Sequence, residues 1–166
     1  MAKGEKRWLF TLSTYLLTIF LKGAGIMLIG KFKNTIDANG RIIFPASFRK
    51  DMGDNIVLAK SLFDGCLCAY SEEEWKRLCE NLKNFPEAKV RQVKSWMFGS
   101  ACLLNPDKQG RVFISNELIQ HASLDKEVIF VGMDSRVELW NAENYDKMYN
   151  SITPESVADV LTQLGF

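Results

Sequence analysis

The sequence contains one stretch twice, first as Ile36-Asp37-Ala38-Asn39-Gly40-Arg41-Ile42-Ile43-Phe44-Pro45 and then as Pro106-Asp107-Lys108-Gln109-Gly110-Arg111-Val112-Phe113-Ile114-Ser115. Asp, Gly and Arg recur 70 residues apart, and each Arg begins an apolar run. The same offset relates Leu67 to Val137 and Trp75 to Tyr145. A constant offset over this length indicates two copies of one supersecondary unit.

Each copy of the stretch has the residues of a tight turn followed by a strand. The Asp side chain can accept backbone N–H bonds within the loop, and Gly adopts positive φ without steric cost. We therefore assign Asp37, Gly40, Asp107 and Gly110 to the shaping of the two loops. The Arg that follows can pair with its Asp or point outward with five donors. The first alternative is a surface ion pair of little energetic weight, and the second offers arginines to a repetitive anionic partner.

The composition is that of an ordinary globular protein, and its charge is uneven. The 166 residues suit one compact domain or two small fused ones, and the net charge is +1. Residues 1–26 contain four basic residues and one acidic residue, which leaves 17 basic and 19 acidic residues in 27–166. Overall charge therefore gives no support for nucleic-acid binding. Residues 31–50 nevertheless combine one acidic residue, Asp37, with five basic ones: Lys31, Lys33, Arg41, Arg49 and Lys50.

The sequence shows no group of residues suited to catalysis. His121 is the only histidine, and the glycines are isolated, so no phosphate-binding loop is present. Four cysteines (Cys66, Cys68, Cys79 and Cys102) form no Cys-x-x-Cys pair, and a zinc site commonly needs about four ligands at closer spacing. Buried free thiols in a reducing compartment fit this pattern better. We therefore expect no enzyme activity, no cofactor and no metal.

Strands and helices are expected in the same order in both copies. The patterns predict strands at 28–36, 41–44, 56–60 and 66–70, and again at 102–104, 111–114, 127–131 and 136–140. Short helices are expected at 46–52 and 117–122. Ser71 and Glu74 have the spacing of a capping box, which predicts a helix that ends before Pro86 and pairs with a helix at 87–99. Helices at 142–150 and 154–165 follow, and four aromatic residues are expected in the core: Trp75, Trp96, Trp140 and Tyr145.

Residues 1–26 differ from the rest of the chain. Positions 8–21 are apolar or hydroxyl residues, a run too short to span a bilayer comfortably but similar to the core of a signal peptide. Three interpretations compete: a secretory leader, a membrane anchor, or a wrongly chosen start codon. Patterned sequence begins directly after Met27, which favours a functional protein that starts there. An intact mass of the native protein that includes residues 1–26 would reject this start.

Residues 27 to about 165 resemble the MraZ family of bacterial transcriptional regulators, which carry two SpoVT-AbrB domains. The resemblance rests on Asp37-x-x-Gly40-Arg41 with its strand and Pro45, on Asp107-x-x-Gly110-Arg111, and on Cys102, Val131-Gly132 and Leu139-Trp140. It implies an α+β fold, with a duplicated AbrB-like swapped-hairpin β-barrel core and flanking helices. The expected divisions are an extension outside the fold (1–26), the first SpoVT-AbrB domain (31–73), connecting helices (74–100), the second domain (101–144) and C-terminal helices (145–166).

The resemblance also implies a function. It predicts a homo-oligomeric ring, with an octamer expected, that binds double-stranded DNA at short direct repeats in its own promoter. Such a regulator, expected to be a repressor, would control the division and cell-wall gene cluster from the cytoplasm and nucleoid, without a membrane partner. Arg41 is the best candidate for DNA contact because its copy has the basic excess; Lys33, Asn39 and Arg111 are further candidates.

Two other functions stay open at this point. An oligomeric scaffold could use the same paired loops to contact protein, and its binding would withstand moderate salt. A membrane-tethered or exported protein could use residues 8–21. Loss of salt-sensitive DNA binding on Arg41→Ala would distinguish the regulator from the scaffold, and cell fractionation would test the membrane alternative.

Overall fold

The computed structural model describes residues 27–62 and 64–166, so the interpretations of residues 1–26 concern a segment outside the described residues. Within the described part, each copy contributes four strands and three helices. The first copy contains β1 (Lys31–Thr35), β2 (Arg41–Ile43), α2 (Ala46–Met52), β3 (Ile56–Lys60), β4 (Leu67–Ser71), α3 (Glu72–Lys83) and α4 (Glu87–Phe98). The second contains β5 (Cys102–Leu104), β6 (Arg111–Phe113), α5 (Asn116–His121), β7 (Glu127–Gly132), β8 (Val137–Asn141), α6 (Ala142–Asn150) and α7 (Pro154–Leu164). No helix among these combines the length and the apolar character needed to cross a bilayer.

The two copies exchange strands to build one antiparallel sheet of order β1-β7-β8-β4-β3-β5. The first strand of each copy pairs with the third strand of the other, β1 with β7 and β5 with β3. The fourth strands, β4 and β8, meet in the middle, where Cys68 lies opposite Glu138. Because the order reads the same when the copies are interchanged, an approximate two-fold axis passes through this central pair.

The remaining strands form a separate two-stranded sheet, β2 with β6. These strands are short because Pro45 and Ser115 follow shortly after them and serve as the N-caps of α2 and α5. The α+β fold and the duplication are therefore confirmed. The swapped-hairpin barrel is not confirmed, since within the described ranges the six-stranded sheet is open, with β1 and β5 at its edges.

The main core lies between the large sheet, the β2–β6 pair and the short helices α2 and α5. Phe44 and Phe130 pack edge to face there, with ring centroids 5.2 Å apart. Phe48 of α2 and Leu118 of α5 are equally buried, so both copies supply the same kind of anchor. Full burial of a side chain of this size stabilises a fold by about 1.5–3 kcal/mol. This core holds the turn-containing loops of the two copies next to each other.

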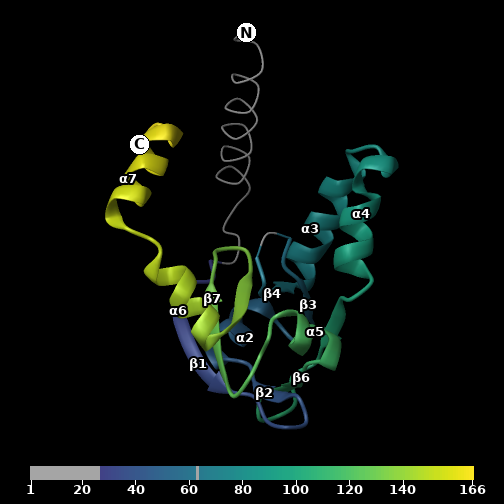
Figure 1. Ribbon diagram of the computed structural model, residues 1–166. Coiled ribbons are helices and arrows are strands. Elements are labelled where there is room, and N and C mark those ends of the chain that lie inside the picture. Colours follow the sequence, from purple (N-terminus) through teal and green to yellow (C-terminus); the bar gives the residue numbers. More distant parts are fainter. Residues whose placement is uncertain (1–26, 63) are drawn as a thin grey trace.

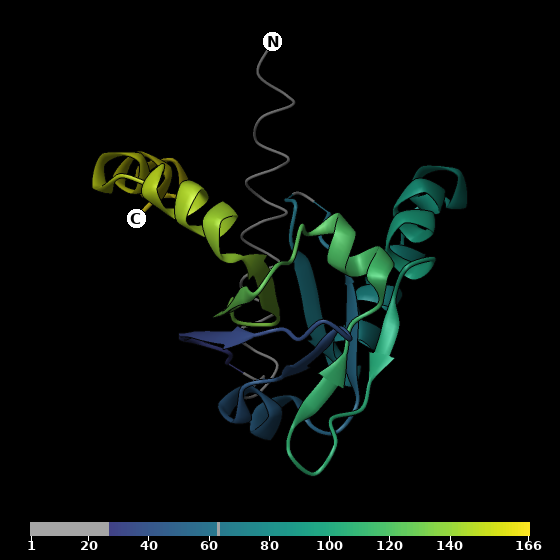
Figure 2. The same cartoon turned by 60° about the horizontal axis from the view of Figure 1, so that its bottom comes forward.

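The longer helices project from opposite sides of the sheet as two arms, α3–α4 and α6–α7, at the end away from β2 and β6 (Figures 1 and 2). Ser71 caps α3 by accepting a hydrogen bond from the N–H of Glu74, which confirms the predicted helix start. Trp75 and Phe98 join α3 to α4 with ring centroids 5.2 Å apart. The predicted helical pair is thus present.

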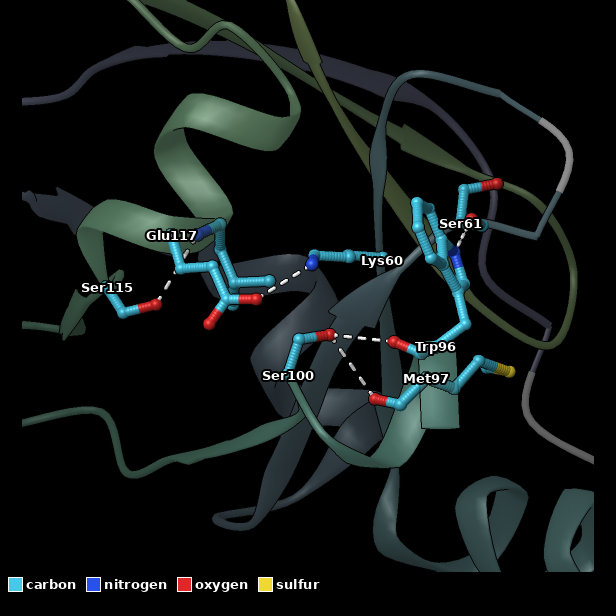
Figure 3. A network of polar contacts seen from close by, with 8 residues as sticks. Lys60, Ser61, Trp96, Met97, Ser100, Ser115 and Glu117 are labelled. Carbon is cyan, nitrogen blue, oxygen red and sulfur yellow. Dashed lines mark hydrogen bonds and ion pairs between the residues drawn. The ribbon is translucent and has the colours of Figure 1, made fainter. Parts of the chain in front are cut away.

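A polar network fixes α4 to the second copy (Figure 3). The indole N–H of Trp96 donates to the carbonyl oxygen of Ser61 at 3.0 Å. The ammonium group of Lys60 lies 5.1 Å from the centroid of the Trp96 ring and pairs with Glu117 of α5 at 2.7 Å. The Trp96 side chain is nevertheless 46% exposed, so its assignment to the core was wrong. Its position at the rim leaves the indole N–H close to a backbone carbonyl and its ring face open to a cation.

Two further differences from the sequence prediction have local causes. The first strand begins at Lys31 and not at Leu28, because Gly30 adopts a φ of +99° and interrupts it. Leu28 instead forms an isolated bridge with Asp134. Trp140 is buried as predicted, whereas Trp75 is only half-buried on α3.

Candidate nucleic-acid interface

The two repeated loops have the same internal hydrogen bonds. In the first loop, the Oδ1 atom of Asp37 accepts from the N–H groups of Asn39 and Arg41, both at 2.9 Å. The N–H of Gly40 donates to the carbonyl oxygen of Asp37 at 3.0 Å, and Gly40 has a φ of +77°. The Asp37 carboxylate therefore stabilises the loop, because its Oδ1 atom accepts hydrogen bonds from backbone N–H groups of the same loop.

The second loop repeats this arrangement. Asp107 accepts from the N–H groups of Gln109 and Arg111 at 2.9 Å each, and Gly110 has a φ of +79°. Positive φ is readily adopted by glycine and is strained for other residues. The Asp and Gly residues at equivalent positions in the two copies thus produce two closely similar turns.

The loops are also bonded to each other across the two copies. The N–H of Ile114 donates to the carbonyl oxygen of Gly40 at 2.8 Å, and the N–H of Phe44 donates to that of Gly110 at 2.9 Å. Between these bonds, β2 and β6 pair in antiparallel register, with Ile42 opposite Val112. We call this unit, residues 37–44 and 107–114, the paired-loop ribbon. It lies at the bottom of Figure 1 and comes forward in Figure 2.

One face of the paired-loop ribbon points into the core and the other into solvent. Ile42 and Val112 are buried, whereas Arg41, Ile43, Arg111 and Phe113 are exposed. The register places Arg41 opposite Phe113 and Ile43 opposite Arg111. Arginine and apolar side chains therefore alternate diagonally across the outer face. Sequence reasoning missed Ile43 and Phe113, although the two-residue period of a strand gives the signal, because residues i and i+2 share a face.

The two arginines of the ribbon differ in their surroundings. The Nε atom of Arg111 pairs with the Oδ2 atom of Asp107 at 2.8 Å. The backbone N–H of Arg111, followed by its guanidinium group, lowers the pKa of Asp107. Among the residues that the structure describes, the guanidinium group of Arg41 has no hydrogen bond or ion pair. Arg41 thus presents all five donors, and Arg111 presents only its terminal amino groups freely.

The other candidates from the sequence lie beside these arginines in different states. Asn39 is exposed in the same loop as Arg41. Lys33 lies on the edge strand β1 and pairs with Glu127 of β7 at 3.2 Å, so its charge already has a partner. The next residue, Asn34, donates from Nδ2 to the carbonyl oxygen of Ile43 at 2.6 Å and fastens β1 to the ribbon.

Arg49 has a structural position between the two copies. Its Nε atom donates to the carbonyl oxygen of Phe44 at 2.9 Å. Its guanidinium group lies directly against Gly110, where an added Cβ would come within 2.6 Å of the Arg49 Cζ atom. A cavity of about 280 Å³ opens next to it, lined in part by Lys50 and Asp107. The basic residues of α2 therefore extend the positive surface beside the second loop.

Comparison with known proteins agrees with the duplication. Residues 27–94 and 97–164 each match the family model described as "MraZ protein, putative antitoxin-like". Proteins named transcriptional regulator MraZ are similar over 84% of this chain: 42% identical in Thermoanaerobacter pseudethanolicus, over 99% of that protein, and 40% identical in Lachnoclostridium phytofermentans, over 98% of that protein. The one from Clostridium acetobutylicum is 39% identical over 99% of its length. These names describe transcriptional regulators, which are not enzymes, in agreement with the sequence prediction. With both halves matched by one model and with relatives of this similarity, the chain belongs to the MraZ family.

Proposed function

We propose that this chain regulates transcription by binding double-stranded DNA with the outer face of the paired-loop ribbon. The supporting observation is that the ribbon carries Arg41 and Arg111, one from each copy, on a single exposed surface. The major groove of B-DNA admits a two-stranded β-ribbon. The names of the relatives support a regulatory role, and the ribbon supplies a surface of suitable shape and chemistry.

The outer residues of the ribbon suit different parts of DNA. Arg41 can bind guanine O6 and N7 with two hydrogen bonds or clamp a phosphate. Asn39 can bind adenine N6 and N7 with two hydrogen bonds. Ile43 and Phe113 can contact thymine methyl groups. Lys33 would contact a phosphate after breaking its ion pair with Glu127. The Asp37 carboxylate, held by backbone N–H groups of its own loop, presents less repulsion to phosphate than a free carboxylate would.

The proposal includes assembly into a ring, expected to be an octamer, on direct repeats. Support comes from α7, whose apolar residues Val157, Val160, Leu161 and Leu164 are all exposed. They continue into a groove of about 440 Å³ beside Tyr149 and Ile152. A neighbouring copy would cover this surface. Several ribbons would then bind several repeats, and avidity would raise affinity without new contacts. The expected target is the protein's own promoter in the division and cell-wall gene cluster. We expect the protein to act there as a repressor, in the cytoplasm and nucleoid.

Fluorescence anisotropy tests this function directly. The full chain is titrated into a duplex from upstream of its own operon and into a shuffled duplex of the same composition, at several salt concentrations. We expect selective binding whose log affinity falls linearly with log salt, by about 0.9 per phosphate contacted. Equal affinity for both duplexes would contradict the proposal and favour a scaffold or a non-specific binder.

The Leu161→Asp variant is expected to break the assembly. Burying a carboxylate in an apolar contact is costly, so the mass measured by light scattering should fall to that of smaller species. Affinity for a duplex with several repeats should fall at least tenfold, while affinity for one repeat should change little. Gln163→Asp adds the same charge to the polar side of α7 and should leave the mass unchanged. An unchanged mass for Leu161→Asp would exclude α7 from the interface.

A further inference from the structure

Three side chains of types that commonly bind metal ions lie together near the approximate two-fold axis, at the centre of the large sheet. This group consists of Cys66, Cys68 and Glu138, whose sulfur and carboxylate oxygen atoms all lie within 4.8 Å of one another. All three are buried, with exposed fractions of 0%, 2% and 6%. The sequence analysis predicted no metal site because the cysteines form no Cys-x-x-Cys pair and the expected ligands are not closely spaced. The strand register supplies the third ligand, since it places Glu138 of the second copy opposite Cys68 of the first.

The carboxylate of Glu138 is oriented by neighbours and keeps one free acceptor position. Arg136 donates to its Oε1 atom from Nε at 3.2 Å and from Nη2 at 2.8 Å. The indole N–H of Trp140 donates to Oε2 at 3.0 Å. A carboxylate offers about four lone-pair positions, so one remains on Oε2. Hydrogen bonds of this kind from a surrounding layer hold a metal-binding carboxylate in position.

The charges of the group also suit a divalent cation. Two thiolates, the Glu138 carboxylate and the Arg136 guanidinium group together carry two negative charges, which one divalent cation cancels. With the cation bound and both thiols deprotonated, the buried site would therefore be neutral.

We propose that Cys66, Cys68 and Glu138 bind one Zn²⁺ ion. Zinc accepts thiolate and carboxylate ligands in a tetrahedral arrangement with Zn–S distances of about 2.3 Å, which places neighbouring ligand atoms about 3.8 Å apart. The atoms here need to approach by about 1 Å at most. A cavity of about 320 Å³, lined in part by Cys68, Tyr70 and Arg136, borders the group at Cys68. A water molecule from this cavity would be the fourth ligand.

This site would join the two copies at the centre of the sheet that they share. Cys66 directly precedes β4, Cys68 lies in β4 and Glu138 lies on β8, so the ion links two strands whose register has only three residue pairs. A ligand that binds the folded state and not the unfolded chain raises stability by mass action. The site is separate from the paired-loop ribbon and does not depend on the proposed DNA binding.

Titration with Co²⁺ and then Zn²⁺ tests the site in the reduced full chain. We expect one Co²⁺ per chain with an intense thiolate-to-cobalt charge-transfer band, which Zn²⁺ abolishes by displacing the cobalt. Zinc should raise Tm by several degrees. Cys66→Ala and Cys68→Ala should each lose the band and the Tm shift. Cys102→Ala removes a thiol outside the group and should retain both.

Three results would overturn the proposal. The first is the absence of a charge-transfer band in the wild type, and the second is a band that persists in Cys68→Ala. The third is a folded Glu138→Gln variant that binds zinc as tightly as the wild type. We expect this variant to bind zinc at least tenfold more weakly while its circular dichroism stays native. If that variant does not fold, X-ray absorption of the zinc-loaded wild type decides the question. Two sulfur ligands with oxygen ligands are expected, and four sulfur ligands would exclude Glu138.

Discussion

The Arg41→Ala variant should lose most of its selective affinity for the promoter duplex. Loss of one arginine that reads a base or clamps a phosphate costs about 1–3 kcal/mol, and the loss is repeated in every subunit that contacts a repeat. We therefore expect at least a hundredfold weaker binding to a duplex with two or more repeats. Fluorescence anisotropy at one fixed salt concentration measures this, with circular dichroism to show that the variant is folded.

Two other arginines serve as comparisons for Arg41. Arg91 is an exposed arginine of α4, in the arm away from the ribbon, and Arg91→Ala should leave the affinity unchanged (Figure 1). Arg111→Ala should have a smaller effect than Arg41→Ala, because its Nε atom is already bound to Asp107. Selective binding that survives Arg41→Ala would contradict the assignment and move the contact toward Arg111.

The Gly40→Ala variant should be strongly destabilised. Gly40 has a φ of +77°, and an added Cβ would lie 2.7 Å from the carbonyl oxygen of Ile114. The backbone strain costs about 1–2 kcal/mol, and displacing β6 also breaks the 2.8 Å bond from the Ile114 N–H to Gly40, worth about 1 kcal/mol. We expect the free energy of unfolding in urea to fall by about 2–3 kcal/mol.

Gly165 provides a control for this substitution. It lies in the left-handed region with a φ of +89° and a ψ of 23°, and an added Cβ would meet no atom within 4 Å. Gly165→Ala therefore carries the backbone strain without the clash, and it should cost at most about 1–2 kcal/mol. An equal loss in the two variants would mean that the bond between the loops contributes nothing to stability.

Local sequence signals predicted most of the elements correctly. The strand β3, the strand β5 and the helix α6 have the expected bounds. The helix starts after the capping residues Ser71 and Thr153 were also correct, whereas α5, capped by Ser115, begins one residue before the predicted start. These features depend on neighbours within a few residues. The repeat offset was equally readable, because each copy keeps its own turn and strand residues.

The features that sequence reasoning missed depend on side-chain placement and on contacts between elements far apart in the sequence. Trp96 looked like a core residue from its spacing on a helix, but its neighbours are Lys60 and, from the other copy, His121 of α5. The freedom of Arg41 relative to Arg111 depends on side-chain placement that the shared motif does not reveal. The proximity of Glu138 to two cysteines required the register between β4 and β8.

The central position of the sheet has an evolutionary consequence. In a symmetric dimer of identical chains, a residue on the two-fold axis must face its own copy, so a glutamate there would meet a glutamate of like charge. Fusion of two copies into one gene removes that requirement, and here Cys68 faces Glu138. A single base change can then alter one partner without the other. The axis, where a dimer is most constrained by symmetry, is thus the place where a fused chain can acquire chemistry that neither ancestral half could hold alone.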